Sequence, residues 1–263
     1  MKWLTLVALA GLLAYTTAQG KGGNCTIAAF KIAQDVFTSQ LGLPPYYDWQ
    51  DPIDLLVGVQ NTLVNGLAGY DNGLIAVCRS FNAMLNNLAS NNVNIYTCFE
   101  PLFIMSQDNT PENAYAYVAT MKMIAFNCGG GFYTALKNWP CIQNAYQTQN
   151  TTLFSAITSM LQQIADTPDR ACAYTKNALL TWTTAFDKVC NQPDTEYYGC
   201  QTMLQFTNTW YPICNDVCYV PTRQQALVEF GVDDKEYMKK LRNNWAETRN
   251  IHKPVFHIDL ESM

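Results

Sequence analysis

Cysteine is the residue type that says most about the chemistry of this chain. An even number of cysteines in an exported chain predicts disulfides, here five, whose pairing cannot be deduced from the spacing. The alternative, a zinc site, needs Cys-x-x-Cys or close Cys and His pairs. No Cys-x-x-Cys occurs, and His252 and His257 lie beyond the last cysteine, so we predict disulfides and neither a metal nor another cofactor. The cysteines expected to pair are Cys25, Cys78, Cys98, Cys128, Cys141, Cys172, Cys190, Cys200, Cys214 and Cys218.

Nucleophilic catalysis of the Ser-His-Asp or Cys-His kind needs an imidazole beside the nucleophile. The only imidazoles are near the C-terminus, and the thiols are expected to be oxidised, so we predict that the protein is not an enzyme. One stretch, Tyr46 to Asp54, places carboxylates among aromatic rings, as a sugar-cleaving pair of acids would require. The simpler interpretation is that Asp51 caps a helix and Asp54 is an acid in its first turn.

Two shorter motifs have a chemical and a structural interpretation. Cys128-Gly129-Gly130-Gly131 is rich in glycine like a phosphate loop, but it follows no strand and lacks a Gly-Lys-Ser/Thr continuation, so we expect a turn that ends a helix. Cys214 and Cys218 are four residues apart rather than three, which differs from redox-active Cys-x-x-Cys pairs. We expect them to belong to two separate structural disulfides.

The N-terminus indicates where the protein acts. Residues 1–18 combine a lysine, an apolar run and a small-residue site ending at Ala18, which predicts a secretory signal peptide and an extracellular protein. No later stretch is apolar enough to span a bilayer. Asn24-Cys25-Thr26 and Asn150-Thr151-Thr152 are sequons, so Asn24 and Asn150 are candidate glycosylation sites.

Charge is sparse along the chain. Charged residues make up 14% of it, against about 25% in ordinary soluble domains, and the net charge is −5. A chain without a basic face is a poor match for nucleic acid, so we expect no nucleic-acid partner.

These residues must be positioned by helices, since every cysteine-containing segment has a helical pattern. The clearest helix begins at Thr110-Pro111-Glu112, ends at Gly129, and is apolar on nearly all sides, which is typical of a central helix. We therefore predict an all-α, disulfide-stapled bundle of about six to eight helices. The other helices are expected over residues 25–40, 52–69, 74–88 with Asp71 as cap, near 98, 153–164, 168–190 and from 195 past 206, with an exposed connection over 143–152.

The chain is expected to have three parts. A signal peptide (1–18) precedes a cysteine-rich helical domain (19–221) and a charged tail (222–263) that is predicted to be partly helical. The tail holds seven of the sixteen Lys and Arg residues and no cysteine.

One spacing pattern resembles a known family. Tyr96-Thr97-Cys98-Phe99, a long helix, Cys128-Gly129-Gly130-Gly131-Phe132 and Asn138-Trp139-Pro140-Cys141-Ile142 resemble the cysteine-rich secreted domains of nematodes, including the chondroitin-proteoglycan-four type. The resemblance implies an extracellular, non-enzymatic protein and supplies no catalytic residues. No serine is followed by glycine, so the usual attachment dipeptide for chondroitin is missing.

Two functional hypotheses follow. The first is a secreted protein that acts by binding an extracellular protein or glycan, or as a structural component. The second is a carrier of small apolar ligands such as fatty acids or sterols, which requires Met, Phe and Tyr side chains of the helices to line a cavity rather than a packed core. We expect the packed core, because bulky residues lie on both sides of the central helix.

Overall fold

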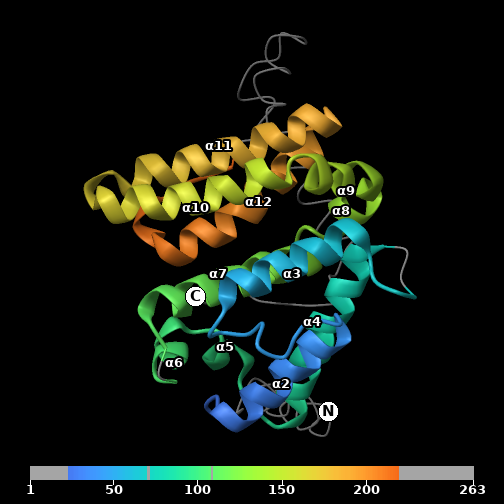
Figure 1. The fold of residues 1–263 in the computed structure, drawn as a ribbon, viewed down its shortest axis with the longest axis vertical. Helices are drawn as coiled ribbons and strands as arrows, with labels where there is room; N and C mark the ends of the chain where they lie inside the picture. The colour runs from blue at the N-terminus through green and yellow to red at the C-terminus, as the bar shows by residue number, and fades with distance from the viewer. Residues whose placement is uncertain (1–22, 70–71, 108, 219–263) are drawn as a thin grey trace, which may run out of the picture. The chain divides into compact units, whose positions relative to one another are not determined.

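The computed structural model describes residues 23–69, 72–107 and 109–218 of the chain. Within these residues the fold is all-α, with eleven α-helices and two short 3-10 helices, as predicted (Figure 1). The number of α-helices exceeds the expected six to eight because several are short. The predicted signal peptide (1–18), the helix cap Asp71 and the charged tail (222–263) lie outside the described residues.

The chain forms two compact units. The first ends at Ala125 and the second begins at Phe126, so the division falls inside helix α7 (Pro111–Cys128). The prediction of one cysteine-rich domain over 19–221 stays a prediction.

The first unit is built around the ring of Phe30. This fully buried ring packs against Trp49 at 5.1 Å, Phe103 at 5.5 Å and Tyr117 at 5.8 Å between ring centroids. Helix α4 packs against both α2 and α3, and α5 contacts α4 and α6. The helices before α7 are α2 (Ile27–Gln40), α3 (Pro52–Asn65), α4 (Gly73–Ser90), α5 (Ile95–Cys98) and α6 (Pro101–Met105).

The start of α4 is capped by Asn72. Its side chain accepts hydrogen bonds from the backbone N–H groups of Leu74 and Ile75. Gly73 follows directly, and a Cβ atom there would clash with the backbone of Thr62 in α3. The close approach of α3 and α4 therefore requires glycine at this position.

Helix α7 has the predicted bounds. Thr110 Oγ1 accepts a hydrogen bond of 3.2 Å from the backbone N–H of Asn113, which is the expected cap. Side chains on all sides of the helix are buried, among them Tyr117, Met121 and Ile124. The three glycines after Cys128 form the predicted turn, in which the N–H of Gly131 donates to the carbonyl of Phe126.

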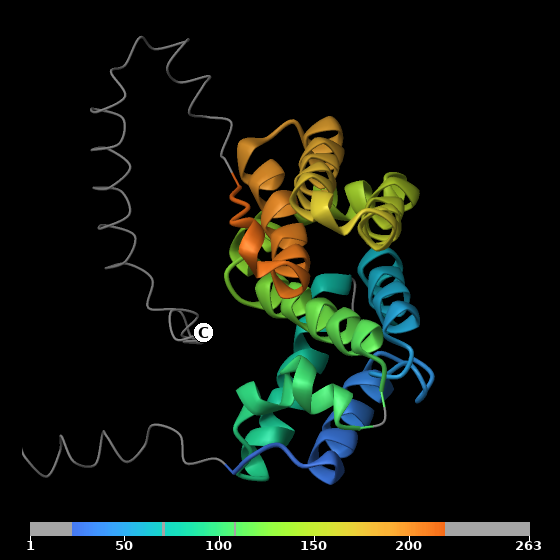
Figure 2. The same cartoon turned by 90° about the vertical axis from the view of Figure 1, so that its left-hand side faces the viewer.

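The second unit places three long helices side by side (Figure 1 and Figure 2). Helix α11 packs against α10, α12 and α9, and the short connections make sequential helices neighbours. Its core holds the buried rings of Trp182, Phe186, Tyr146 and Tyr198. The helices are α8 (Phe132–Lys137), α9 (Trp139–Thr148), α10 (Asn150–Asp166), α11 (Ala171–Cys190) and α12 (Pro193–Trp210), with 3-10 helices η1 (Pro168–Arg170) and η2 (Pro212–Cys214).

Two sequence predictions in this unit are wrong. Residues 143–152 are not an exposed connection, because α9 and the start of α10 cover them. The polar residues mark the outer face of α9, while Ile142, Ala145 and Tyr146 are buried on its inner face. The helix predicted over residues 168–190 begins at Ala171, because residues 168–170 first form the 3-10 turn η1.

A buried polar cluster joins α7, α9 and α12 within the second unit. The hydroxyls of Tyr146 and Tyr198 are 3.2 Å apart, and Thr202 Oγ1 donates a hydrogen bond of 3.0 Å to Oδ1 of Asn127. Burial raises the pKa of Tyr146 to about 12 and that of Tyr198 well above its usual value. The cluster is therefore neutral at any physiological pH.

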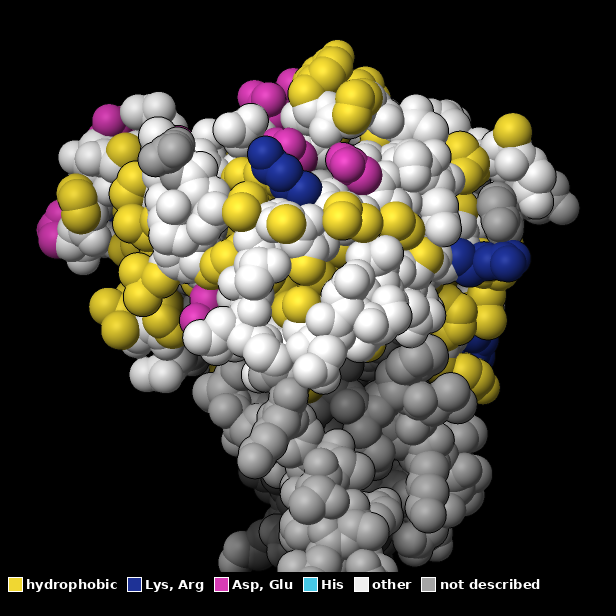
Figure 3. Space-filling view, turned by 90° about the horizontal axis from the view of Figure 1, so that it is seen from below, with side chains coloured by type: hydrophobic (Ala, Val, Ile, Leu, Met, Phe, Trp, Pro, Cys, Tyr) yellow, Lys and Arg dark blue, Asp and Glu magenta, His cyan; other side chains and the backbone are white. Residues whose placement is uncertain are grey.

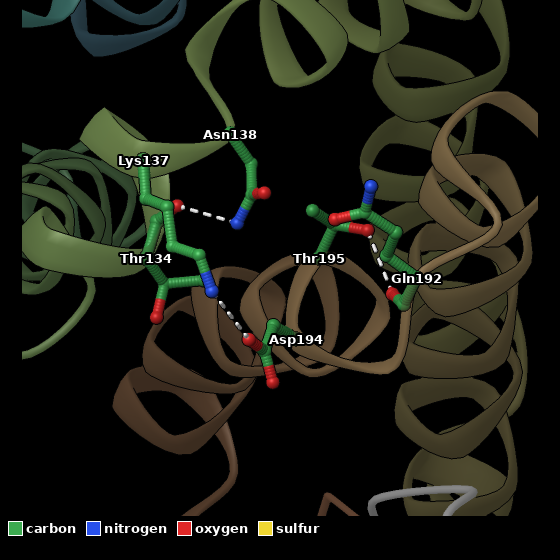
Figure 4. Close-up of polar contacts among 6 residues, drawn as sticks. All are labelled: Thr134, Lys137, Asn138, Gln192, Asp194 and Thr195. Atoms are coloured by element: carbon green, nitrogen blue, oxygen red, sulfur yellow. Dashed lines mark hydrogen bonds and ion pairs between the residues drawn. The ribbon is translucent and has the colours of Figure 1, made fainter.

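Polar contacts at the start of α12 include one ion pair between exposed side chains. Lys137 Nζ of α8 lies 3.8 Å from Asp194 Oδ2 in the first turn of α12 (Figure 4). In the same view the amide of Asn138 donates to the carbonyl of Thr134, and the Thr195 hydroxyl donates to the carbonyl of Gln192. Such an exposed ion pair contributes at most about 1 kcal/mol to the free energy of unfolding. The stability of this unit therefore depends mainly on its buried core.

Disulfides tie the helix ends of each unit together. Cys25–Cys98 joins the start of α2 to α5 in the first unit. In the second unit Cys141–Cys190 joins α9 to the end of α11, and two further bridges, Cys172–Cys214 and Cys200–Cys218, hold the segment after α12. Cys78 and Cys128 are also disulfide-bonded, so all ten cysteines are oxidised and the expected five disulfides are present.

Candidate functional site: the aromatic-acidic loop

Residues 43–51, which we call the aromatic-acidic loop, connect α2 to α3 in the first unit. Their backbone is folded into two local turns. The N–H of Tyr47 donates to the carbonyl of Pro44 at 3.0 Å, and the N–H of Gln50 donates to Oδ1 of Asp48 at 2.7 Å. Two successive prolines, Pro44 and Pro45, are the first two residues of the first turn and limit its conformations. The loop therefore has a defined shape of its own.

Three side-chain amides donate hydrogen bonds to backbone carbonyls of the loop. Nε2 of Gln34 in α2 donates to the carbonyl of Tyr47 at 3.4 Å, and Nδ2 of Asn109 donates to the carbonyl of Trp49 at 2.5 Å. Nδ2 of Asn113 in α7 donates to the carbonyl of Gln50 at 2.8 Å. Three of four consecutive loop carbonyls are thus bound by groups from other parts of the unit, which restrains the loop without a regular secondary structure.

The amide of Gln34 is itself fixed by Tyr117. The Tyr117 hydroxyl donates a hydrogen bond of 2.5 Å to Oε1 of Gln34, and both side chains are buried. Burial raises the pKa of Tyr117 well above its usual value, and the negative charge of Asp48 raises it further. The hydroxyl therefore remains a donor, which leaves the Gln34 amide nitrogen oriented toward the loop.

Trp49 anchors the loop in the core. Its ring is 4% exposed, packs on Phe30, and has Nζ of the exposed Lys31 at 5.9 Å from its centroid. A lysine at this distance from an indole ring makes a favourable cation–π contact. The Trp49 side chain therefore fixes the middle of the loop against α2.

The outer face of the loop is aromatic and acidic. Tyr46 is 59% exposed and packs edge-to-face on Tyr47 at 5.2 Å between centroids. Gln50 and Asp51, four and five residues further along the chain, are also exposed, and Asp54 follows in the first turn of α3. An exposed ring can stack on an apolar surface of a partner, and exposed carboxylates and an amide in the same segment can accept and donate hydrogen bonds.

Asp48 is the loop acid with the most perturbed environment. Partial burial raises the pKa of its carboxyl, and the charge of Asp51 raises it further, although the hydrogen bond from the Gln50 N–H acts in the opposite direction. The carboxylate of Asp48 also closes the turn by accepting the hydrogen bond from Gln50, so Asp48 has a structural role in the loop.

The structure confirms the predicted position of one neighbouring acid, Asp54, and corrects the predicted role of the other, Asp51. Asp54 lies in the first turn of α3 as expected. Asp51 occupies the N-cap position, but its side chain makes no capping hydrogen bond, so the prediction that it caps the helix is wrong. The loop turns at Asp48, and the carboxylate of that residue rather than Asp51 binds the local N–H of Gln50. The side chain of Asp51 is exposed.

The other predicted sites are distributed over both units. Asn24 and Asn150 are both exposed, the first next to Cys25 and the second at the start of α10. Their glycosylation stays a prediction. Cys214 and Cys218 belong to two different bridges, as expected. Among the described residues, no group of three or more His, Cys, Asp or Glu side chains is arranged to hold a metal ion.

A surface pocket of about 280 Å³ lies between α2 and α4. Its lining combines a guanidinium and an amide with two alanines: Arg79, Gln40, Ala76 and Ala83. Ligand pockets for drug-sized apolar molecules are usually larger and lined mainly by hydrophobic side chains. This pocket is therefore a poor match for a fatty acid or sterol.

The described surface carries few charges. On the face shown in Figure 3, Lys, Arg, Asp and Glu side chains are few, and hydrophobic side chains adjoin one another across the middle of the face, among backbone and other side chains. No helix in the described part of the chain combines the length and hydrophobicity needed to cross a bilayer.

Comparison with known proteins adds no family or fold. No protein-family model matches the chain, and neither a curated protein nor a solved structure matches it. The resemblance to nematode cysteine-rich secreted domains therefore stays a prediction.

Proposed function

We propose that this is a secreted, non-enzymatic protein that binds an extracellular partner through the aromatic-acidic loop. The observation that carries the proposal is the set of three amides, from Gln34, Asn109 and Asn113, that bind three of four consecutive loop carbonyls. A loop restrained in this way pays little conformational entropy when it binds, which favours affinity. The same loop exposes Tyr46, and tyrosine is enriched in binding surfaces.

The chemistry of the loop favours a polar partner, either an extracellular protein or a glycan. Tyr46 offers a ring for stacking, while Asp51 and Gln50 offer hydrogen-bonding groups that remain in contact with water. A protein partner with basic side chains would also be favoured by the net charge of −5.

Secretion is supported by two separate features. Complete pairing of ten cysteines is typical of proteins that fold in an oxidising compartment. The N-terminal sequence has the order of a signal peptide, and Asn24 and Asn150 are exposed sequons. Release of the protein into the medium, with a mature N-terminus after Ala18 and a mass shift on glycosidase treatment, would test these points together.

The alternative of an apolar-ligand carrier has less support. The side chains of α7 that would need to face a cavity, such as Tyr117, Met121 and Ile124, are buried among protein atoms. We expect no stoichiometric lipid in an organic extract of the purified protein. One lipid recovered per chain would favour the carrier instead.

The proposed binding role is tested by comparing two tyrosine variants. Tyr46→Ala removes the exposed loop ring, and Tyr133→Ala removes a ring of similar exposure, 70%, in the second unit. We expect Tyr46→Ala to weaken binding to a glycan array or to extracellular proteins of the source organism at least about tenfold, the effect of a binding hot spot. Tyr133→Ala should bind like the unchanged protein. Equal binding by all three proteins would contradict a role for the loop.

A further inference from the structure

The segment after α12, residues 211–218, is held by two disulfides that lead to different helices. Cys214 is bonded to Cys172 at the start of α11, and Cys218 is bonded to Cys200 in α12. Between them, Oδ2 of Asp216 accepts a hydrogen bond of 2.6 Å from the Thr175 hydroxyl. The segment also exposes two apolar side chains, Ile213 at 81% and Val217 at 56%.

The Cys172–Cys214 bridge differs from the others in its access to solvent. Cys172 is exposed and Cys214 is half-buried, so neither partner is covered by the protein. In each of the bridges Cys25–Cys98, Cys141–Cys190 and Cys200–Cys218, at least one cysteine is buried, and Cys78 is buried as well. Because thiol–disulfide exchange requires a thiolate to reach a sulfur atom, Cys172–Cys214 is the bridge most open to attack.

The position of Cys172 also makes it a good leaving group. It is the second residue of α11, where the positive end of the helix dipole stabilises a thiolate. Lys176 lies four residues later and is exposed, which places its ammonium group on the same side of the helix. A thiolate released at Cys172 is therefore stabilised by two sources of positive charge.

We propose that Cys172–Cys214 is a site of thiol–disulfide exchange with an extracellular thiol reductant, either a small thiol or a dithiol protein. The thiolate of the reductant attacks Sγ of Cys214, forms a mixed disulfide with it and releases the Cys172 thiolate. A second thiol, from the same dithiol protein or from another molecule of the small thiol, then attacks the mixed disulfide and releases the Cys214 thiolate. The protein bridge gains two electrons and two protons, and the reductant is oxidised to its own disulfide.

Opening this bridge changes the attachment of one segment only. Residues 211–217 lose their covalent link to α11, while Cys200–Cys218 still holds the end of the segment at α12. The segment that carries Ile213 and Val217 is then tied to α11 by non-covalent contacts such as the hydrogen bond from Thr175 to Asp216, and no longer by a disulfide. Thiol–disulfide exchange at this site thus changes how firmly the segment with these two exposed side chains is attached to α11.

The test is a titration of the folded, full-length protein with reduced glutathione, followed by alkylation and peptide mass spectrometry. Cys172 and Cys214 should be alkylated together, about tenfold faster than any other cysteine, with the helical circular dichroism unchanged. Earlier opening of another bridge, or simultaneous opening of all five, would overturn the proposal.

Two matched variants test the leaving-group argument without removing a cysteine. Lys176→Gln should slow the opening of Cys172–Cys214 by glutathione about two- to threefold, because it removes the nearby positive charge. Lys188→Gln is the control, since Lys188 is exposed in the last turn of the same helix. Equal rates for the two variants would contradict the assignment of Cys172 as the leaving thiolate.

Discussion

The Tyr117 hydroxyl on α7 donates a hydrogen bond of 2.5 Å to Oε1 of Gln34 on α2, a contact between residues 83 apart in the sequence. Through this bond, the amide nitrogen of Gln34 is directed to the carbonyl of Tyr47 in the aromatic-acidic loop. The buried side-chain amide of Gln34 therefore links the core of the first unit to its candidate binding loop.

Removing this hydroxyl should destabilise the first unit. Tyr117→Phe leaves Oε1 of Gln34 buried without its donor, which costs about 1–3 kcal/mol in the free energy of unfolding. Chemical denaturation monitored by Trp fluorescence measures the change. The control is Tyr96→Phe. Tyr96 is 44% exposed, so water can form the hydrogen bonds that are lost with its hydroxyl. Equal stability of the two variants would show that the Tyr117–Gln34 bond is unimportant.

Loss of one supporting amide should loosen the loop while leaving the core intact. Asn113→Ala removes the donor to the Gln50 carbonyl, worth about 1 kcal/mol, so opening of the loop becomes roughly fivefold more frequent. Hydrogen exchange of the amides of residues 46–50 measures this change. Asn177→Ala, at an exposed position of α11, is the control and should leave exchange in the loop unaltered.

Asp48 gives the loop a pH dependence whose sign follows from its raised pKa. Because the folded pKa lies above the ordinary value of 3.8, the folded state binds a proton before the unfolded state as the pH falls. Ionised Asp48 therefore lowers stability above its folded pKa, and this cost disappears as the pH falls toward 3.8.

Two variants separate the charge of Asp48 from its hydrogen bond. Asp48→Asn keeps the Oδ1 acceptor for the Gln50 N–H and removes the charge, so it should be more stable than the unchanged protein at pH 7 and lose this advantage in acid. Asp48→Ala removes the acceptor as well as the charge, so at each pH it should be about 1 kcal/mol less stable than Asp48→Asn. Urea denaturation at pH 7 and near pH 3.5 measures both effects. An Asn variant less stable at pH 7 would refute the assigned burial cost.

The buried tyrosines of the second unit should make the protein sensitive to alkali. The pKa of Tyr146 is raised from 10.0 to about 12 by burial, so above pH 10 the unfolded state loses its tyrosine proton first. The free energy of unfolding should then fall by about 1.4 kcal/mol per pH unit for Tyr146, up to its folded pKa. Below pH 10 this stabilisation is fully present.

Absorbance at 295 nm, recorded with circular dichroism, measures this titration. Ionisation of Tyr146 and Tyr198 should coincide with unfolding, because both hydroxyls are buried and the pKa of each is raised in the folded protein. Full ionisation of every tyrosine near pH 10 with intact helices would contradict the buried cluster.

The helices and the chemistry of the cysteines could be predicted because they depend on local patterns. Thr110-Pro111 and the glycines after Cys128 mark both ends of α7, and an even number of cysteines predicts complete pairing. The error over residues 143–152 arose because polar residues on the outer face of α9 hide the apolar face that Ile142 and Tyr146 share.

The supports of the loop could not be predicted because they are contacts between distant segments. Gln34 lies on the apolar stripe of α2 four residues after Phe30, and a polar residue on such a stripe is a detectable signal of a buried hydrogen bond. Its partners Tyr47 and Tyr117 were not identifiable from spacing. Asn109 and Asn113 flank a helix start, where asparagine is common for local reasons.

Site-specific photo-crosslinking tests the central claim, that the aromatic-acidic loop is the binding surface, most directly. A benzoylphenylalanine at position 46, introduced into the full-length protein and irradiated with extracellular proteins and glycans of the source organism, should form a discrete adduct. The same group at position 133, a site of comparable exposure, should not form that adduct. An adduct of equal yield at both positions, or at position 133 alone, would contradict the account.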